Sequence, residues 1–140
     1  MKRRLVIRFN APVILGFALL ALLALLLGGW TDDATTYLYF SVYRAPLSDP
    51  LTYVRFFGHV LGHADYEHYM GNMLLLLLVG PGIEEKYGHK TTALCIAVTA
   101  LVTGLVQFIF FPDTVLLGAS GVVFMMIVLS SFTEMGKEGI

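Results

Sequence analysis

The chain has 140 residues, of which 57% are hydrophobic and 14% are charged, and its net charge is −1. Together with a mean hydropathy of +0.77, this composition excludes an ordinary water-soluble domain. No basic stripe follows the first few residues, which argues against a nucleic-acid partner. The single cysteine, Cys95, rules out an internal disulfide, and we expect it to be a small buried apolar residue.

The first predicted element is a membrane span over residues 11–29. About 20 apolar residues cross a hydrocarbon core about 30 Å thick, and this run has that length. It is longer than the apolar part of a signal peptide. Trp30 and two aspartates follow it, where a signal peptide would have a small-residue cleavage site. The basic residues before it predict a cytoplasmic N-terminus.

The long segment 30–64 contains one predicted helix. Ser48-Asp49-Pro50 is a helix start, with a capping side chain before a proline at the first helical position. Apolar residues then recur at helical spacing at Leu51, Val54, Phe57 and Leu61. This pattern predicts a short amphipathic helix, rich in Tyr and Phe, that lies at the membrane interface.

Three further spans are predicted, over residues 65–79 (with a possible helical continuation to Tyr87), 91–111 and 115–132, with short loops at 84–90 and 112–114. The fold class is therefore all-α: a multi-pass integral membrane protein, expected in a prokaryotic plasma membrane. With the N-terminus inside, the second and fourth spans both start on the outer side. Ser120 would lie about five residues into the fourth span, about 8 Å below its start.

His68 and Asn72 form the first polar pair of interest. They are four residues apart, so they share one face of the second span. Polar side chains inside a membrane are costly and usually face a protein interior or a water-filled cavity. This pair could donate hydrogen bonds to an oxyanion, together with the backbone N–H of Ser120. The alternative is a hydrogen bond between two helices.

Ser120 is the candidate nucleophile. Gly118 and Gly121 leave little bulk around its hydroxyl, so a peptide could reach the oxygen. The alternative is the ordinary packing of small residues between membrane helices. The joint occurrence of this serine with the His/Asn pair favours a serine hydrolase inside a bilayer.

A metal site is an alternative for His59, His63 and His68. Histidines four apart on a helix can chelate zinc, but the HExxH arrangement with its catalytic glutamate is absent. We therefore expect hydrogen bonds from these histidines to loop backbone, and no metal.

Other polar and small residues of the later spans need structural explanations. Glu84 is either a charged boundary of the second span or a tie between helix ends. Gln107 lies within the third span and requires a partner. Three small residues of that span form a face for close helix packing: Ala97, Ala100 and Gly104.

These features together resemble the rhomboid family of intramembrane serine proteases. Residues 118–121 (GASG) are similar to the family's GxSG motif, and residues 68–72 (HYMGN) to its HxxxN motif. Arg55 with two later histidines is similar to the first-loop pattern. The pattern GxxxExxxG ending the second span is matched at Gly80, Glu84 and Gly88. The resemblance with specific motifs covers residues 54–132, and Val54 stands where the family usually has an aromatic residue.

The resemblance implies functions for these residues. Ser120 would be the nucleophile, and His68 and Asn72 would stabilise the oxyanion. Glu84 would be structural, and the first loop would be organised by Arg55, His59 and His63. No cofactor would be required. The substrates would be single-pass membrane proteins, cleaved within the lipid bilayer near the outer end of their membrane segment.

The general base of the family is a histidine on a sixth span, and nothing in this sequence corresponds to a fifth or sixth span. His59 and His63 precede the second span and are not expected to replace that base. We therefore expect residues 1–140 to be one rhomboid-like domain truncated at its C-terminus and inactive alone. The alternative is a naturally short, non-catalytic relative that binds membrane helices as a chaperone or adaptor.

Overall fold

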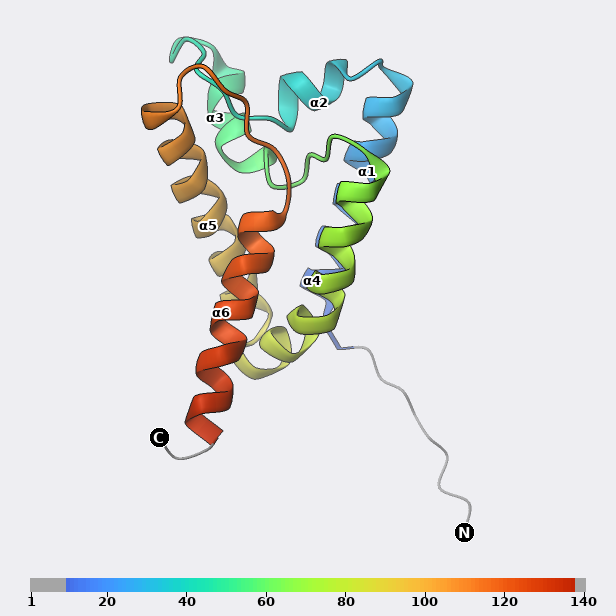
Figure 1. The fold of residues 1–140 in the computed structure, drawn as a ribbon, viewed down its shortest axis with the longest axis vertical. Coiled ribbons are helices and arrows are strands. Elements are labelled where there is room, and N and C mark those ends of the chain that lie inside the picture. The colour runs from blue at the N-terminus through green and yellow to red at the C-terminus, as the bar shows by residue number, and fades with distance from the viewer. Residues whose placement is uncertain (1–9, 138–140) are drawn as a thin grey trace.

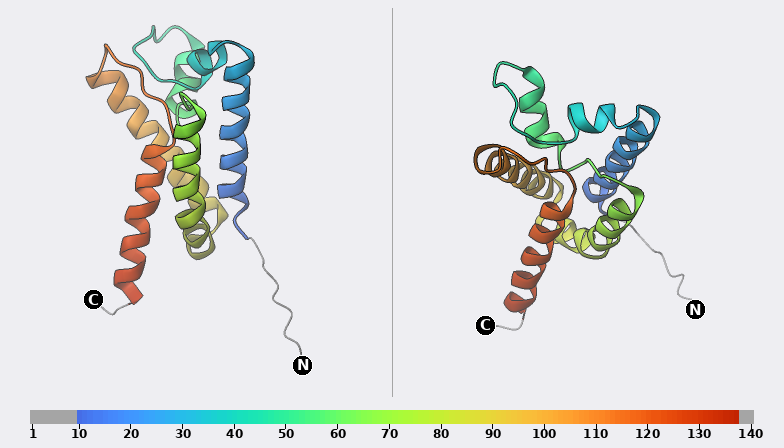
Figure 2. Two further views of the ribbon diagram at one scale, coloured as in Figure 1. Left: turned by 45° about the vertical axis from the view of Figure 1, so that its right-hand side comes forward. Right: turned by 45° about the horizontal axis from the view of Figure 1, so that its top comes forward.

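The computed structural model describes residues 10–137, which contain six helices and one isolated β-bridge. The helices are α1 (Pro12–Trp30), α2 (Ala34–Tyr39), α3 (Pro50–Gly58), α4 (Tyr66–Tyr87), α5 (His89–Phe110) and α6 (Ser120–Lys137). The four long helices form a bundle, and the short helices α2 and α3 gather at one end of it (Figures 1 and 2). The all-α class is confirmed.

Two helices, α1 and α5, are long and apolar enough to cross a membrane by length and composition. The apolar stretch of α6, Ser120–Thr133, is shorter, and α4 does not meet the same criterion. In α4 the apolar run from Met73 to Val79 is short: Asn72 precedes it, and Gly80, Pro81 and Gly82 follow it before the charged residues from Glu84. The structure therefore supports a helical membrane protein with two clear spans, and four spans remain an expectation.

The bundle core is built from residues of all four long helices, with Ile96 and Ala100 contributed by α5. Small or slender side chains of α1 face inward, as Ile14, Ala18 and Ala21 do, whereas Leu19 and Leu20 are more than half exposed. Their partners are Met73 and Leu76 of α4 and Val122 and Met126 of α6. Small residues inside and leucines outside is the arrangement expected of helices packed in lipid.

Helix α3 begins as predicted, and Val54 and Phe57 of its apolar stripe face away from the protein. The Asp49 side chain accepts a hydrogen bond from Leu51 N at 3.0 Å, and Pro50 is the first helical residue. The helix ends at Gly58, so Leu61 lies beyond it. Its buried residues are Thr52, Arg55 and Phe56, whereas Val54 and Phe57 are exposed. The exposed part of the apolar stripe therefore faces the surrounding medium, and the face toward the protein combines polar Thr52 and Arg55 with Phe56. Helix α2, only six residues long, was not predicted.

The junction between α4 and α5 is tighter than the predicted loop at 84–90. Helix α4 continues through Pro81 to Tyr87, and only Gly88 separates it from α5. Gly88 has φ +90°, a conformation that L-residues rarely adopt, so a glycine there can end one helix and start the next. Glu84 consequently lies inside a helix.

The prediction that the fourth helix starts at Val115 is wrong. The backbone of Val42 pairs with that of Leu116 in an antiparallel bridge, with N···O distances of 2.8 and 3.0 Å. Gly118 has φ +122°, which is incompatible with a helix. Helix α6 therefore starts at Ser120 itself, and the estimate that this serine lies about 8 Å below a helix start does not hold.

Candidate active site

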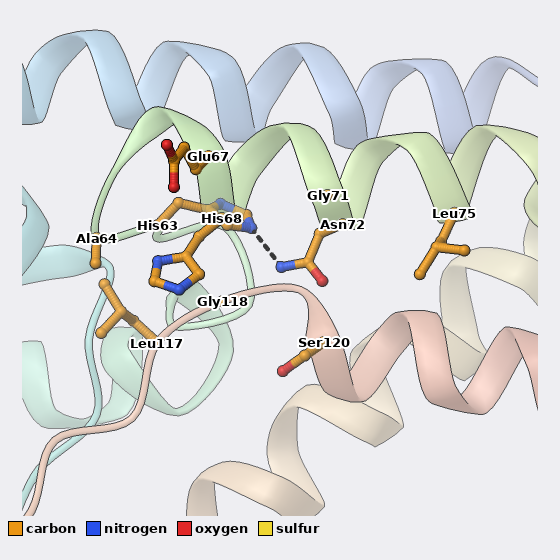
Figure 3. Close-up of a pocket in the computed structure, with 10 residues that line it drawn as sticks. All are labelled: His63, Ala64, Glu67, His68, Gly71, Asn72, Leu75, Leu117, Gly118 and Ser120. Atoms are coloured by element: carbon orange, nitrogen blue, oxygen red, sulfur yellow. Dashed lines mark hydrogen bonds between the residues drawn. The ribbon is translucent and has the colours of Figure 1, made fainter.

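A cavity of about 550 Å³ lies between the first turns of α4 and the start of α6. It brings together the three predicted catalytic side chains, His68, Asn72 and Ser120 (Figure 3). The full lining is His63, Ala64, Glu67, His68, Gly71, Asn72, Leu75, Leu117, Gly118 and Ser120. The two motifs are far apart in the sequence, but residues of both line the same cavity in the structure.

Ser120 is exposed to this cavity, and its hydroxyl makes no hydrogen bond to any side chain or backbone group of residues 10–133. Figure 3 shows the hydroxyl pointing into the cavity. As the first residue of α6, Ser120 has a backbone N–H without an intrahelical acceptor, at the positive end of the helix dipole. Such an N–H can stabilise a developing oxyanion.

His68 and Asn72 occupy the first two turns of α4. Asp65 caps this helix, because its Oδ1 accepts a hydrogen bond from His68 N at 2.9 Å. The same oxygen lies 3.2 Å from Nδ1 of the His68 ring. This contact orients the ring, so that Nε2 is the nitrogen left for a ligand in the cavity. The His68 side chain is 69% exposed and therefore accessible.

His63 lies between the two motifs, and its contact with both was not foreseen from the sequence. Its Nε2 is 3.1 Å from Asn72 Nδ2 and 3.4 Å from the backbone N of Ala119. Its ring meets that of Tyr69 edge-on, with centroids 5.5 Å apart, and the Tyr69 hydroxyl donates to Ala18 O of α1 at 2.9 Å. Burial lowers the pKa of His63 below its usual value of 6.5.

His59 connects the first loop to α5 and to the segment before Ser120. Its Nε2 is 2.8 Å from Ala100 O, and its own carbonyl accepts a hydrogen bond from Gly118 N at 2.8 Å. The helices approach closely here, because a Cβ on Gly104 would lie 2.8 Å from Phe56 O. This is the small-residue packing predicted for α5. Burial also lowers the pKa of His59.

The two loop histidines do not lie on a helix, so the spacing that suggested zinc chelation is not realised. His59 is the C-terminal cap of α3, and His63 lies in the turn before α4. Within the part of the chain that the structure describes, no group of three or more His, Cys, Asp or Glu side chains could hold a metal ion.

Arg55 joins α2 and α3. It is 3% exposed; its Nε donates to Leu38 O at 2.9 Å, and it lies 3.5 Å from the Asp49 carboxylate. Its guanidinium also covers the Tyr43 ring at 4.7 Å. Burial and a hydrogen bond with Tyr37 raise the pKa of Tyr43 to about 12, so the phenol beside the cation stays neutral. These contacts hold the segment between α1 and α3 together.

Glu84 lies at the far end of α4 from the cavity and is fully buried. Its two oxygens accept hydrogen bonds from Ile14 N at 2.8 Å and Val13 N at 3.1 Å, and His89 Nδ1 lies 2.6 Å away. The residue that precedes α1 provides no side-chain cap. Glu84 therefore caps α1 from a distant part of the chain and ties three helix ends together.

Two further polar ties lie near the opposite end of α5. Arg44, which no motif in the sequence marks, donates from Nε to Phe108 O at 2.8 Å and from its terminal nitrogen to Ile109 O at 3.0 Å. It thus satisfies carbonyls of the last turn of α5. The partner that Gln107 requires is Thr114, whose hydroxyl lies 2.6 Å from the Gln107 amide nitrogen.

A family model for the Rhomboid domain matches residues 50–138, which is more than half of the chain. The protein thus belongs to the rhomboid family, as the motifs indicated. The match begins at the first residue of α3 and leaves α1 and α2 outside. A search of curated proteins gives no match to this chain.

Proposed function

We propose that this protein is an intramembrane serine endopeptidase that cleaves membrane segments of single-pass proteins. The observation that supports it best is the cavity in which an exposed serine at a helix N-terminus faces His68 and Asn72. A serine beside hydrogen-bond donors, in a hollow large enough for a peptide, is the arrangement that acyl transfer requires.

In the proposed reaction, Ser120 Oγ attacks the peptide carbonyl carbon, and its proton passes to a histidine base. The family resemblance assigns that base to a sixth span. The carbonyl oxygen becomes an oxyanion, which accepts hydrogen bonds from the Ser120 N–H, Asn72 and His68. Collapse of the intermediate expels the amine, which takes the proton from the base. Water then hydrolyses the serine ester. The proposal uses no metal and no cofactor.

The proposed placement in the bilayer has four spans, α1, α4, α5 and α6, with a cytoplasmic N-terminus. The cavity would then lie near the outer surface of a prokaryotic plasma membrane, at the end of the bundle where α3 lies. The outward-facing Val54 and Phe57 of α3 would contact the lipid interface. A substrate's membrane segment would be cut near its outer end.

The test is active-site labelling with a fluorophosphonate, which phosphonylates activated serines. The protein as its host cell makes it is purified in detergent, labelled and mapped by mass spectrometry. We expect label on Ser120, none in Ser120→Ala, and full labelling in Ser131→Ala. Ser131 is a matched control, because it is also an exposed serine of α6 but bonds to Ile127 O at 3.0 Å. Equal labelling of Ser120→Ala and wild type would refute the assignment.

The second candidate is a non-catalytic rhomboid relative that binds membrane helices as a chaperone or adaptor. It is favoured by the Ser120 hydroxyl, which has no proton acceptor among residues 10–133. This candidate predicts that Ser120 stays unlabelled. It also predicts that a photo-crosslinker at the exposed Phe124 captures intact membrane segments equally well in wild type and in Ser120→Ala.

A further inference from the structure

His63 occupies the space between the two halves of the candidate site. It is 3% exposed and lies in the turn between α3 and α4. Ala119 N, in the segment just before α6, is 3.4 Å from its Nε2. A backbone N–H can only donate, so this ring nitrogen must present its lone pair. In a neutral ring the proton is then on Nδ1.

This lone pair also fixes the orientation of the Asn72 amide. Because Nε2 is an acceptor, the Asn72 atom at 3.1 Å must be the NH₂ group and not the carbonyl oxygen. One of the two Nδ2 hydrogens is used by His63 (Figure 3), and within the described residues no hydrogen bond uses the second, which can therefore bind a ligand. Gly118 lies beside this amide, since a Cβ there would be 3.9 Å from Asn72 Nδ2, and both residues line the cavity.

The same ring helps to hold the residues that precede the nucleophile. Gly118 N donates to His59 O at 2.8 Å, Ala119 N points to His63, and Ala119 O accepts from Val123 N at 2.9 Å. These three hydrogen bonds anchor the backbone on which Ser120 follows. His63 is the only one of these partners that can lose its acceptor function by taking up a proton.

We propose that His63 is a positioning residue whose neutral Nε2 holds both the Asn72 amide and the backbone before Ser120, and that protonation of this nitrogen releases them together. The inference rests on the proposed function for its catalytic consequence, whereas the release itself is independent of activity. It goes beyond loop organisation, because it assigns a defined tautomer and an acid-sensitive step to one ring.

Few charged groups face this ring. From α4 and its cap, Asp65 favours the protonated ring and His68 disfavours it, while Tyr69 presents its ring edge. Glu67 lines the same cavity. The segment 115–119 contributes no ionisable side chain. Burial is the largest influence and lowers the pKa of His63, which keeps its lone pair available at neutral pH.

The first experiment is nitrogen-15 NMR of the histidine rings and asparagine side-chain amides in detergent micelles, with the protein as its host cell makes it. We expect His63 at pH 8 to be protonated on Nδ1 and bare on Nε2. On acidification, the Asn72 amide signals should shift together with the His63 titration. The proposal would be overturned by a His63 ring that is protonated on Nε2 at pH 8. It would also be overturned if the Asn72 amide signals did not shift as His63 titrates.

Matched variants sharpen this result. In His63→Gln the amide oxygen can accept the same hydrogen bonds but does not titrate, so the Asn72 signals should become insensitive to pH. In His59→Gln, which alters the other buried histidine, the Asn72 signals should still follow His63. The wild-type measurement requires no variant, so misfolding of either one leaves the test valid.

The second readout is the pH profile of Ser120 labelling. Protonation of the proposed base histidine alone reduces the labelling rate tenfold per pH unit. Protonation of both that base and His63 reduces it a hundredfold per pH unit. Below both pKa values we expect the hundredfold dependence in wild type and the tenfold one in His63→Gln. Identical profiles would overturn the catalytic consequence. No labelling in wild type, with the NMR result intact, would refute the proposed function and leave the His63 geometry standing.

Discussion

The two ends of α4 carry polar clusters of opposite character. At one end Glu84 is fully buried, and each of its oxygens is hydrogen-bonded. At the other end Ser120 and His68 are exposed to a cavity, and Ser120 Oγ has no partner within residues 10–133. A satisfied buried group stabilises a fold, whereas unsatisfied groups around a hollow are free to bind a ligand. The same helix therefore combines a structural tie and a candidate reaction site.

The largest effect on stability is expected at the Glu84 end of α4, where the buried polar groups are hydrogen-bonded. Glu84→Ala removes the acceptor for Val13 N, Ile14 N and His89. It should lower the free energy of unfolding by about 4 kcal/mol, since buried donors are left unpaired. Unfolding in mixed micelles measures this. Glu84→Gln keeps one acceptor oxygen and should lose less. Equal loss in both variants would show that the carboxylate is not the cap of α1.

The next largest effect is expected on catalytic activity, for a change in the cavity. Asn72→Ala should reduce turnover of a reporter membrane protein about a hundredfold, the usual loss when one oxyanion donor is removed. Unfolding free energy should change by about 1 kcal/mol or less, because only one hydrogen bond, to His63, is lost. Turnover and unfolding are measured on the same preparation of the protein as its host cell makes it. A variant that keeps full turnover would remove Asn72 from the oxyanion site.

The pH dependence of stability should come from the loop near the cavity. The folded-state pKa values of His59 and His63 are lowered from 6.5, so the unfolded chain takes up protons first on acidification. Stability should be constant above pH 6.5. Below it, stability should fall by about 1.4 kcal/mol per pH unit for each histidine until the folded-state pKa is reached.

Unfolding measured from pH 8 to pH 5 checks this dependence. His63→Gln should show a shallower decline than wild type, since only His59 then contributes. A flat profile for wild type would show that these two rings are not held neutral by burial.

The smallest effect on stability is expected for Ser120, the proposed nucleophile. Ser120→Ala removes a hydroxyl without a described partner, so the unfolding free energy should stay within about 0.5 kcal/mol of wild type. Thermal melting in detergent measures it, with Glu84→Ala as the contrasting variant. A large destabilisation would mean that Ser120 packs as an ordinary small residue between helices, and the contrast between the two ends of α4 would fail.

Local signals in the sequence predicted several elements well. Asp49 and Pro50 marked the start of α3, because capping and proline geometry depend on neighbouring residues only. The His/Asn spacing predicted a shared face, and both side chains line the cavity. The start of α6 was missed, because the apolar run 115–117 resembles a span while its backbone pairs with Val42. That pairing joins distant segments and leaves no local pattern.

Hydrogen bonds between distant segments were predicted only in part, because such contacts leave no local pattern in the sequence. Glu84 was suspected as a tie because a charged residue between glycines stands out, but its target, the first turn of α1, could not be named. The contact of His63 with both motifs and the capping of α5 by Arg44 leave no spacing signal. The sequence predicted α3 as an amphipathic helix, but it did not indicate that Thr52, Arg55 and Phe56 form the face packed against the protein.

The cap on α1 has a consequence for the order of assembly. The acceptor for Ile14 N lies 70 residues further along the chain, so it does not yet exist when α1 leaves the ribosome. Until α4 arrives, the first turn of α1 must keep its backbone donors in contact with water or lipid head groups. We therefore expect α1 to be anchored loosely at that end during synthesis and to settle at its final depth only when Glu84 docks.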